Sequence, residues 1–334
     1  MTGCAADCIK GGIRINKLNK KKKRVIVFGS IGGLAAVAAA LVSMAAVTAA
    51  SGGASGINQT ESPDNSIEAS IGSFIIESHK TDGTLYALED GLEPQINEII
   101  DDIKLQCGGE WSVYVCVPHS GDTLSINQKK MQAASTIKLF IMGAVYEEYD
   151  ELVEYYAADD IPELIRTMIE ISDNESADLL VTMLGRGNSV KGRKKVTDYC
   201  KSLGLNNTSM ERMMGDDNII SDNYTSTEDT GKFLEMILNA KLPHSKEMLE
   251  YLKNQTRTTK IPEGLPGNVL SANKTGELDD VENDAAIVFA GRPYILCVMS
   301  DGVNDYQPPI DAISDISTVT YNYLAPKLVV REVS

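Results

Sequence analysis

Residues 135–149 read STIKLFIMGAVYEEY, and this stretch decides the fold. Apolar side chains recur on every face of the helix that it predicts, and such a helix is usually buried in a protein core. Lys138 interrupts the apolar pattern, and a buried ammonium is costly unless it is paired or used. Because positions i and i+3 share a helix face, the Lys138 amine can reach the Ser135 hydroxyl. A desolvated lysine has a lowered pKa, so it can act as the base that activates a serine nucleophile.

Two further motifs follow in order, and each has an ordinary structural explanation when it is taken alone. Ser172-Asp-Asn174 opens the next apolar helix, and these residue types are common N-caps. Lys274-Thr-Gly276 ends a strand-like run at a glycine. A second SxxK, Ser271-Ala-Asn-Lys274, shows that the first motif is weak by itself. SxxK, SDN and KTG in this order and in these settings are together a strong signal of acyl transfer through a serine.

The segments on both sides of these motifs predict one antiparallel sheet with a helical insertion. Helical periodicity predicts helices at 92–105, 135–149, 161–171, 174–184, 191–203, 227–239 and 310–326. Apolar runs bounded by turn residues predict strands at 111–117, 123–127, 269–275, 284–290 and 294–300. Two strands therefore precede the helical middle of the chain, and three strands follow it.

With these motifs the sequence resembles the penicillin-recognising serine hydrolases, and most closely class A β-lactamases, over about residues 91–334. The stretch ISDNESADLL at 171–180 adds to the likeness. The resemblance implies an α/β fold in which helices flank a five-stranded antiparallel sheet. An all-α insertion would form the other side of the active-site cleft. The resemblance implies no cofactor.

The resemblance also implies a role for each motif residue. Ser135 would be the acylated nucleophile, with Lys138 as its general base. Ser172 would relay a proton to the leaving nitrogen, and Lys274 would bind the substrate carboxylate. Together these four are the candidate catalytic residues.

The candidate substrate-binding residues follow the same motifs. Asn174 would hold the acyl amide, and Thr275 would share the carboxylate with the neighbouring lysine. The backbone N–H groups of Ser135 and Glu277 would form the oxyanion hole, where each donor typically contributes about 3–4 kcal/mol. Gly276 lies between these groups on the strand.

The sequence departs from the family pattern in the loop after the SDN helix. In class A β-lactamases this loop supplies a Glu that activates the deacylating water. Here Glu211 and Arg212 resemble the loop's structural ion pair, Asn218 resembles its water-binding Asn, and the place of the catalytic Glu falls on Met214. A thioether cannot accept a proton, and the loss of a general base typically slows a step about 10²–10⁴-fold. We therefore expect impaired deacylation.

Further departures concern the cleft. Asp216 or Asp217 is an alternative base if the loop follows a different path. The 37-residue spacing from Ser135 to Ser172 is shorter than in typical lactamases, which predicts a more open cleft. The strand after KTG carries Glu282-Asn-Asp284 and lacks the Arg that many lactamases place there to bind a carboxylate.

The N-terminal part of the chain predicts a membrane anchor. Residues 25–50 form an uncharged run, and at 1.5 Å per residue its helix would be about 39 Å long, enough to cross a bilayer. The basic tail at 1–24 places the N-terminus in the cytoplasm, so the catalytic domain at 91–334 would be extracellular. A cleaved signal peptide is the alternative, and the protein would then be secreted. Residues 51–90 are expected to be a flexible linker, in which 71–90 is either tether or a small hairpin.

Charge and cysteine usage narrow the range of partners. Residues 1–24 hold eight of the 31 Lys and Arg but one of the 47 Asp and Glu, so the net charge of −16 becomes −23 for the rest. Such an acidic body repels phosphate backbones, and we expect no nucleic-acid partner. The cysteines and histidines lack zinc-ligand spacing, so no metal is expected. Cys116 and Cys297 fall in strand-like runs as buried thiols, with a disulfide between them left open.

Three hypotheses follow, two of them enzymes and the third from another class. The first is a membrane-anchored serine hydrolase that resembles class A β-lactamases and is acylated on Ser135 by β-lactams or related amides. The second is a penicillin-binding D-alanyl-D-alanine carboxypeptidase or transpeptidase acting on peptidoglycan, which slow deacylation and an open cleft favour. The third is a non-catalytic cell-wall binding or sensory domain, which a buried Lys138 beside a serine disfavours. We expect a monomer in each case.

Overall fold

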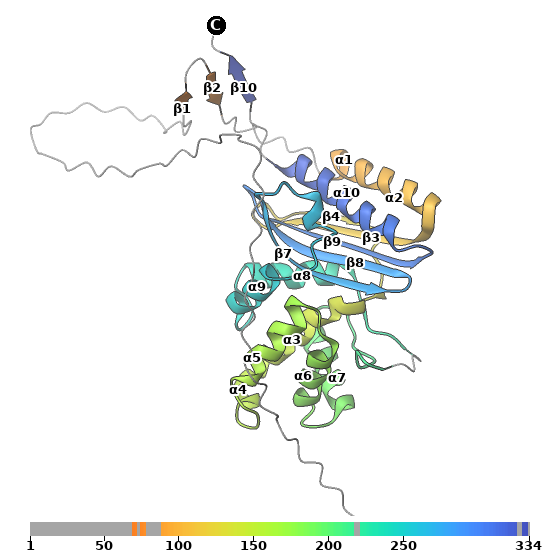
Figure 1. The fold of residues 1–334 in the computed structure, drawn as a ribbon, viewed down its shortest axis with the longest axis vertical. Coiled ribbons are helices and arrows are strands. Elements are labelled where there is room, and N and C mark those ends of the chain that lie inside the picture. Colours follow the sequence, from red (N-terminus) through yellow and green to blue (C-terminus); the bar gives the residue numbers. More distant parts are fainter. Residues whose placement is uncertain (1–68, 72–73, 78–87, 217–220, 326–328, 333–334) are drawn as a thin grey trace, which may run out of the picture. The chain divides into compact units, whose positions relative to one another are not determined.

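The computed structural model describes residues 69–71, 74–77, 88–216, 221–325 and 329–332. Its centre is a five-stranded antiparallel sheet in the order β4-β3-β9-β8-β7 (Figure 1). The strands are β3 (Gly108–Val117), β4 (Asp122–Ile126), β7 (Leu270–Leu278), β8 (Val281–Phe289) and β9 (Tyr294–Val303). This sheet confirms the predicted fold, in which two strands precede the helical insertion and three follow it.

The strands read as unbroken apolar runs because both faces of the sheet are covered. In β3, every residue from Trp111 to Val117 is buried. Successive side chains of a strand point to opposite faces, so Val113 and Val115 join one hydrophobic cluster while Tyr114 and Cys116 join the other. The register pairs Tyr114 with Cys297 and Cys116 with Ile295.

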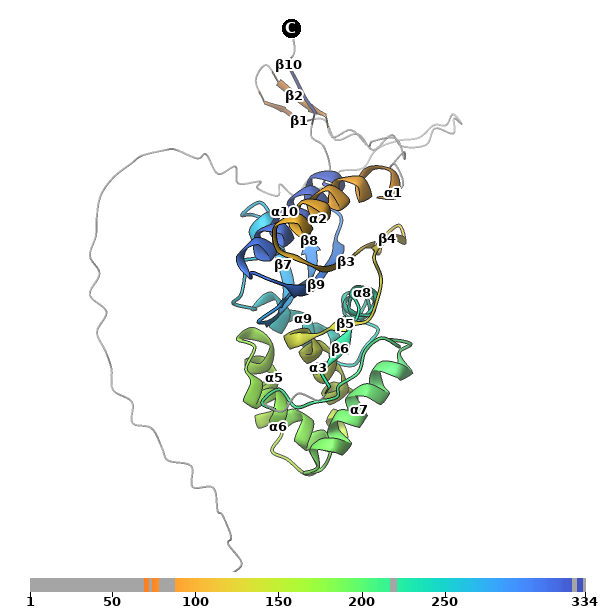
Figure 2. The same cartoon turned by 90° about the vertical axis from the view of Figure 1, so that its right-hand side faces the viewer.

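Helices from both ends of the body pack on one face of the sheet. They are α1 (Leu88–Gly91), α2 (Glu93–Cys107) and α10 (Gln307–Leu324). In Figure 1 they lie above the sheet, and α2 and α10 run side by side in both views (Figure 2). The buried side chains Ile96, Ile100 and Ile103 of α2 recur at helical spacing and meet Ile313 and Ile316 of α10 in one cluster.

The opposite face carries α8 (Thr227–Leu238) and α9 (Ser245–Lys253), and the helical insertion lies beyond them. The insertion consists of α3 (Ile137–Glu147), α4 (Tyr149–Leu152), α5 (Asp160–Glu170), α6 (Asn174–Leu184) and α7 (Ser189–Ser202). Every residue of α3 from Ile137 to Tyr146 is buried, as its all-round apolar pattern predicts. The short strands β5 (Met131–Gln132) and β6 (Tyr224–Thr225) pair beside it.

A separate three-stranded sheet has the order β1-β2-β10. Its strands are β1 (Ala69–Ile71), β2 (Phe74–Glu77) and β10 (Val329–Glu332). Strands β1 and β2 pair antiparallel inside the span that the sequence predicts as linker. In the part of the chain that the structure describes, no helix combines the length and the apolar character needed to cross a membrane. The predicted anchor at 25–50 lies outside the described residues.

The structure corrects the predicted start of the helix at Ser135 and answers whether Cys116 and Cys297 form a disulfide. The predicted helix at 135–149 begins later, because Ser135 lies in a 3-10 turn, η1 (Ala134–Thr136), and α3 starts at Ile137. The cause is local: Ala134 has φ +46°, and the Thr136 N–H returns to the carbonyl of Ala133. Cys116 and Cys297 are free buried thiols rather than a disulfide, since they sit diagonally across two strands. Burial raises the pKa of Cys116 to about 11.

Candidate active site

Ser135 is presented by a strained turn between β5 and α3. Ala134, directly before it, has φ +46°, and Ser172, across the site, has φ +61°. Non-glycine residues rarely adopt this region, and each such residue costs about 1–3 kcal/mol, which the surrounding packing must offset. Both strained residues flank the same pocket, as often occurs at functional sites.

The start of α6 explains why the SDN motif is more than a helix cap. Asp173 is the N-cap, and its carboxylate accepts a hydrogen bond of 2.7 Å from the N–H of Ser176. Because Asp173 satisfies the helix start, the side chains of Ser172 and Asn174 on either side remain for other partners. Both turn toward Lys138.

Strand β7 brings the KTG motif against the Ser135 turn. Gly276 allows this approach, since a Cβ there would stand 2.8 Å from the carbonyl oxygen of Ala133 and 3.1 Å from the N of Thr136. On the neighbouring strand, Asn283 donates to the carbonyl oxygens of Gln132 and Ala133 at 2.9 and 3.3 Å. The edge of the sheet is thereby tied to the turn that carries the candidate nucleophile.

The two motif lysines meet at one hydroxyl. The Lys138 amine donates to the carbonyl oxygen and to Oγ of Ser172 at 2.5 and 3.3 Å, and to Oδ1 of Asn174 at 2.6 Å. The Lys274 amine donates to Oγ of Ser172 at 3.0 Å and to the carbonyl oxygen of Thr275 at 2.8 Å. A hydroxyl oxygen has two acceptor positions, so both are used here, and the proton of Ser172 is left for a third partner.

Burial perturbs both amines, which are fully enclosed. The pKa of Lys138 is lowered to about 8, mainly by burial and in part by the charge of Arg257, while Asp173 and Asp178 act in the opposite direction. Burial also lowers the pKa of Lys274 well below its usual range, and the charges of Lys138 and Arg257 add to this effect. The positive charges of Lys138 and Lys274 repel each other, so one of the two amines loses its proton readily near physiological pH.

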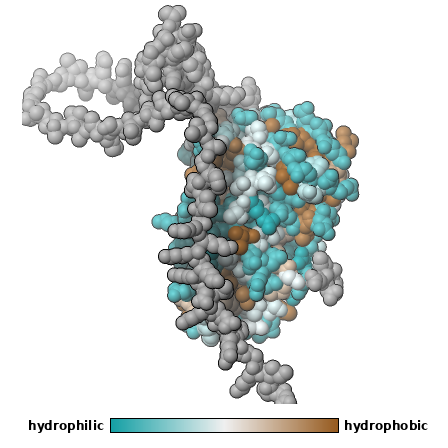
Figure 3. All heavy atoms as spheres, in the orientation of Figure 1, coloured by the Kyte–Doolittle hydropathy of each residue, from teal (hydrophilic) through white to brown (hydrophobic). Residues whose placement is uncertain are grey.

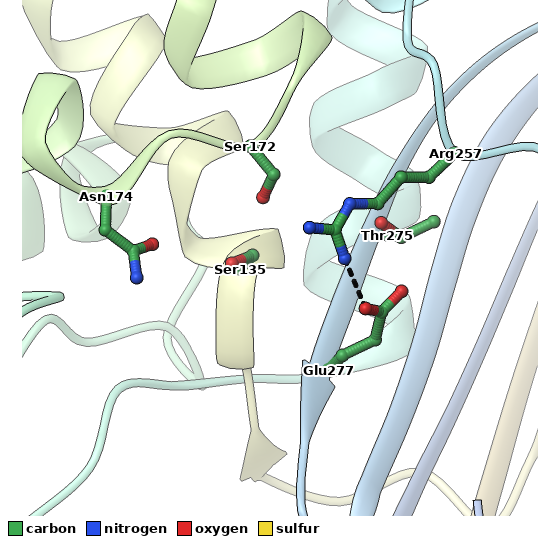
Figure 4. Close-up of a pocket in the computed structure, with 6 residues that line it drawn as sticks. All are labelled: Ser135, Ser172, Asn174, Arg257, Thr275 and Glu277. Atoms are coloured by element: carbon green, nitrogen blue, oxygen red, sulfur yellow. Dashed lines mark hydrogen bonds and ion pairs between the residues drawn. The ribbon is translucent and has the colours of Figure 1, made fainter.

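A pocket of about 160 Å³ lies between the insertion and the sheet. In Figure 4, Ser135 stands between Ser172 and Asn174 on one side and the β7 residues on the other. The pocket is lined by Ser135, Ser172, Asn174, Arg257, Thr275 and Glu277. The structure therefore brings the predicted residues together: Lys138 and Lys274 donate to Ser172 Oγ, and Gly276 stands against the turn that carries Ser135. Among the described residues, no hydrogen bond joins Ser135 Oγ to Lys138, whose amine instead faces Ser172 and Asn174.

Arg257 lines the pocket but is not among the site residues predicted from the sequence. It lies between α9 and β7, 17 residues before Lys274, and its guanidinium reaches the pocket where it pairs with the Glu277 carboxylate. The strand after the KTG motif carries no Arg. The segment between α9 and β7 instead supplies Arg257 to the pocket. No spacing rule signals it, because the contact depends on how the 254–269 segment folds back over β7.

The ion pair in the loop after α7 differs from the pair expected from the sequence. Arg212 pairs with Asp222 at 2.8 Å, and both side chains are buried, so the expected pairing with Glu211 is wrong. Adjacent side chains point to opposite sides here: Glu211 is exposed and accepts from Ser209 at 3.0 Å.

The backbone at Met214 is fastened to α6. The Asp178 carboxylate, one turn after Asn174, accepts from the N–H groups of Met214 and Gly215 at 2.7 and 3.0 Å. Met214 packs on the hydrophobic core and is not among the residues that line the pocket. Asp216, an alternative base, accepts from the N–H of Met213 within its own loop. Asp217 and Asn218 lie outside the described residues.

This arrangement can perform acyl transfer. A half-buried hydroxyl, Ser135, faces a hydroxyl that two amines hold in place, and one of those amines can be neutral near pH 8. The guanidinium of Arg257 and the hydroxyl of Thr275 suit an anionic group of a substrate. Across the described residues, no cluster of three or more His, Cys, Asp or Glu is arranged to hold a metal.

Comparisons with known proteins agree with the fold. The β-lactamase enzyme family matches residues 91–152 and 157–324, whereas no curated protein sequence matches the chain. A β-lactamase from Xanthomonas campestris pv. campestris str. ATCC 33913 has a TM-score of 0.61 and 18% identity over 70% of this chain and 99% of its own. A β-lactamase from Sphaerobacter thermophilus DSM 20745 has a TM-score of 0.59 and 21% identity over 69% of this chain and 96% of its own.

A third similar structure is PBP-A, with a TM-score of 0.60 and 22% identity over 70% of this chain and 96% of its own. A variant of PBP-A is described as an acyl-enzyme complex with penicillin G. At identities of 18–22%, these solved structures show that the fold is shared. Membership of the family rests on the family match, which covers most of the chain. By its sequence and by its sheet with a helical insertion, the chain belongs to the β-lactamase enzyme family.

Proposed function

We propose that this chain is a serine hydrolase of amide bonds, acylated on Ser135 by β-lactams or related amides. The hydrogen-bonded chain from Lys138 through Ser172 to Lys274, at the wall of the pocket that Ser135 lines, carries the proposal. Two fully buried lysines are costly in a pure binding domain, and this cost is understandable if their amines move protons. The acyl-enzyme of a PBP-A variant supports the same chemistry on this fold.

The proposed acylation requires the Lys138 amine to turn from Asn174 toward Ser135. Neutral Lys138 accepts the proton of Ser135 while the Ser135 Oγ forms a bond to the substrate carbonyl carbon. The carbon–nitrogen bond then breaks, and the leaving nitrogen takes the proton of Ser172. The Lys138 ammonium returns its proton to Ser172 along the 3.3 Å hydrogen bond. The products are an ester on Ser135 and a free amine, and the lysine is neutral again.

The pocket favours a substrate with a carboxylate close to the scissile bond. Thr275, Arg257 and the buried amine of Lys274 lie on the β7 side of Ser135. An arginine presents its donors in a planar fork that matches a carboxylate. Both β-lactams and peptides that end in a free carboxylate fulfil this requirement.

Deacylation is proposed to be slow, because Met214 occupies the place of the expected base. The one carboxylate that lines the pocket, among the described residues, is Glu277, and Arg257 and Lys260 already bind it. Met214 also favours a second candidate function, a D-alanyl-D-alanine carboxypeptidase or transpeptidase on peptidoglycan. In that reaction an amine acceptor, whose nucleophilic nitrogen needs less activation than water, can release the acyl group.

The proposal includes the location of the protein. The uncharged run at 25–50 with its basic flank supports a single membrane anchor, with the catalytic body outside the cytoplasmic membrane and working as a monomer. Substrates of the cell-wall peptide class would be within reach of such a body.

The test is to incubate the full chain in detergent with penicillin G and follow its intact mass over time. We expect a covalent adduct that maps to Ser135 and persists for minutes or longer. Ser135→Ala should form no adduct. Ser271→Ala, which alters the serine of the second SxxK, is the matched control and should react like the wild type.

The outcomes separate the candidates. Rapid loss of the adduct with release of hydrolysed penicillin indicates an efficient β-lactamase. A long-lived adduct that an added D-amino acid or peptide amine releases indicates the peptidase or transpeptidase. Absence of any adduct in the wild type leaves the non-catalytic binding domain and refutes the proposal.

A further inference from the structure

The mouth of the pocket holds an ion pair whose carboxylate has no role in the acylation steps above. Arg257 Nη1 donates to Oε2 of Glu277, and the rest of the guanidinium is turned toward Ser172 and Ser135 (Figure 4). Arg257 belongs to an exposed segment, and 46% of its side chain is accessible to solvent. An arginine in such a place has many rotamers available unless another group holds it.

Glu277 is itself anchored from behind. Its Oε1 lies 3.2 Å from the amine of Lys260, which is fully buried and lies 2.5 Å from Oε2 of Glu282. Lys260 also donates to the carbonyl oxygen of Asn283 at 3.1 Å, so two of the three donors of the ammonium have hydrogen-bond partners, and Glu282 adds an ion pair. The carboxylate of Glu277 is therefore fixed in the sheet.

The charge state of Glu277 suits this role. Burial raises its pKa, but the charges of Lys260 and Arg257 outweigh burial, so its pKa is lower than usual. Glu277 thus stays an anion near neutral pH, and two cations flank it. Lys260 also pairs with Glu282, so the charges of the four residues balance, and the remaining N–H donors of Arg257 are the groups that can attract an anionic substrate.

We propose that Glu277 is a positioning residue that holds Arg257 over the pocket, so that the free donors of Arg257 receive the carboxylate of the substrate. The contact with Glu277 uses one nitrogen of the guanidinium, whereas arginine has five N–H donors. Competition between Glu277 and a substrate carboxylate is thereby avoided. This inference rests on the proposed function, since it concerns the substrate of the same site.

The test compares two probes of the full chain in detergent, penicillin G and its methyl ester, which lacks the carboxylate charge. The measured quantity is the second-order rate constant for acylation of Ser135. We expect Glu277→Gln to lower this constant about tenfold for penicillin G and less than twofold for the ester. At a pH above the pKa of Lys138 in both proteins, where a shift of that pKa does not limit the rate, Arg257→Ala should show the same selective loss, and the double variant should be no slower than Arg257→Ala alone.

Two further variants distinguish positioning from a general effect on the fold. Glu277→Asp keeps the charge and should recover part of the rate with penicillin G. Asp279→Asn removes a nearby exposed carboxylate in the turn after β7 and should leave both probes unchanged. Melting temperatures of all variants report any loss of folding separately.

Three results would overturn the inference. Faster acylation by penicillin G in Glu277→Gln would mean that Glu277 competes with the substrate carboxylate. Equal losses with both probes would mean that Glu277 supports the sheet or the oxyanion hole in general. Additive losses in the double variant would mean that the two residues act independently. Failure of the proposed function looks different, because the wild type would then form no Ser135 adduct with either probe.

Discussion

Ser172 joins two buried amines that the sequence places 136 positions apart, at Lys138 and Lys274. Neither amine has a carboxylate as a hydrogen-bond partner among the contacts of the described residues, and nearby carboxylates offset the cost of burial only in part. That cost appears as lowered pKa values for both lysines. A neutral lysine beside a serine is the group that a general base requires.

The first prediction concerns pH. Because burial lowers the pKa of Lys138 to about 8, the neutral fraction falls about tenfold for each pH unit below that value. The acylation rate constant of Ser135 should therefore fall between pH 8 and pH 6, as measured by intact mass in a pH series. Arg257→Ala should move this limb to higher pH, since the charge of Arg257 is one cause of the lowered pKa.

A variant that keeps the positive charge of Lys138 tests in a second way whether acylation needs a neutral base there. Lys138→Arg cannot supply a neutral base and should lose about 10²–10⁴-fold in acylation. Lys129→Arg, at a surface lysine that pairs with Glu110, should behave like the wild type. A rate that stays constant from pH 6 to pH 9 would argue against Lys138 as the base.

At the scale of elements, two contacts place the site. Strand β7 approaches the Ser135 turn at Gly276, and the 211–216 loop is tied to α6 through Asp178. The buried pair Arg212–Asp222 closes this loop near its ends. The contacts of Gly276 and of Asp178 join segments that are distant in sequence, whereas Arg212 and Asp222 belong to the same stretch of chain.

Gly276→Ala tests the approach of β7. The added Cβ would stand 2.8 Å from the Ala133 carbonyl oxygen, so the strand or the turn must shift. We expect acylation to fall at least about tenfold and stability to fall by about 1–3 kcal/mol in urea unfolding. Gly267→Ala is the control, since nothing lies within 4 Å of a Cβ there. Wild-type acylation in Gly276→Ala would show that this close approach is unnecessary.

Met214→Glu tests the loop. A carboxylate at a position whose backbone is fastened to α6 next to the SDN motif should restore a base for water. We expect the acyl-enzyme to clear at least about tenfold faster, as followed by mass after excess penicillin G is removed. Met213→Glu, one residue earlier and also packed on the core, should not accelerate clearance. An unchanged lifetime in Met214→Glu would place the missing base elsewhere.

At the scale of the whole molecule, charge is unevenly distributed along the chain. The first 24 residues are basic, and the rest is net −23. The face of the body in Figure 3 is mostly hydrophilic, with hydrophobic residues in small separate patches. Exposed hydrophobic residues that are scattered in this way are normal on protein surfaces.

The proposed anchor leads to a prediction about fractionation. When the full chain is expressed in bacteria, we expect it in the membrane fraction, resistant to alkaline carbonate and to high salt. A variant without residues 1–50 should be found in the soluble fraction and should be acylated within about twofold of the full chain, because the pocket lies in the body. Recovery of the intact full chain from the culture medium would indicate a cleaved signal peptide instead.

Local patterns predicted most of the elements. The unbroken apolar run at 111–117 predicts the buried strand β3, and the all-round apolar pattern after Ser135 predicts the core helix α3. Helix α9 was not predicted, although Met248 and Leu252 are buried at helical spacing, because its nine residues are a short stretch in which to recognise a period. The 3-10 turn at Ser135 was also not predicted, because its strained backbone depends on the contacts around it.

The sequence by itself determined the nucleophile motif, the order of SxxK, SDN and KTG, and the sheet with a helical insertion. These features depend on residue type and short-range periodicity, which a sequence displays directly. Tertiary structure alone decided that Arg257 reaches the pocket, that Arg212 pairs with Asp222, and that two lysines share Ser172. Such contacts join residues from separate elements, and their partners are set by how the packed core aligns those elements rather than by any local pattern.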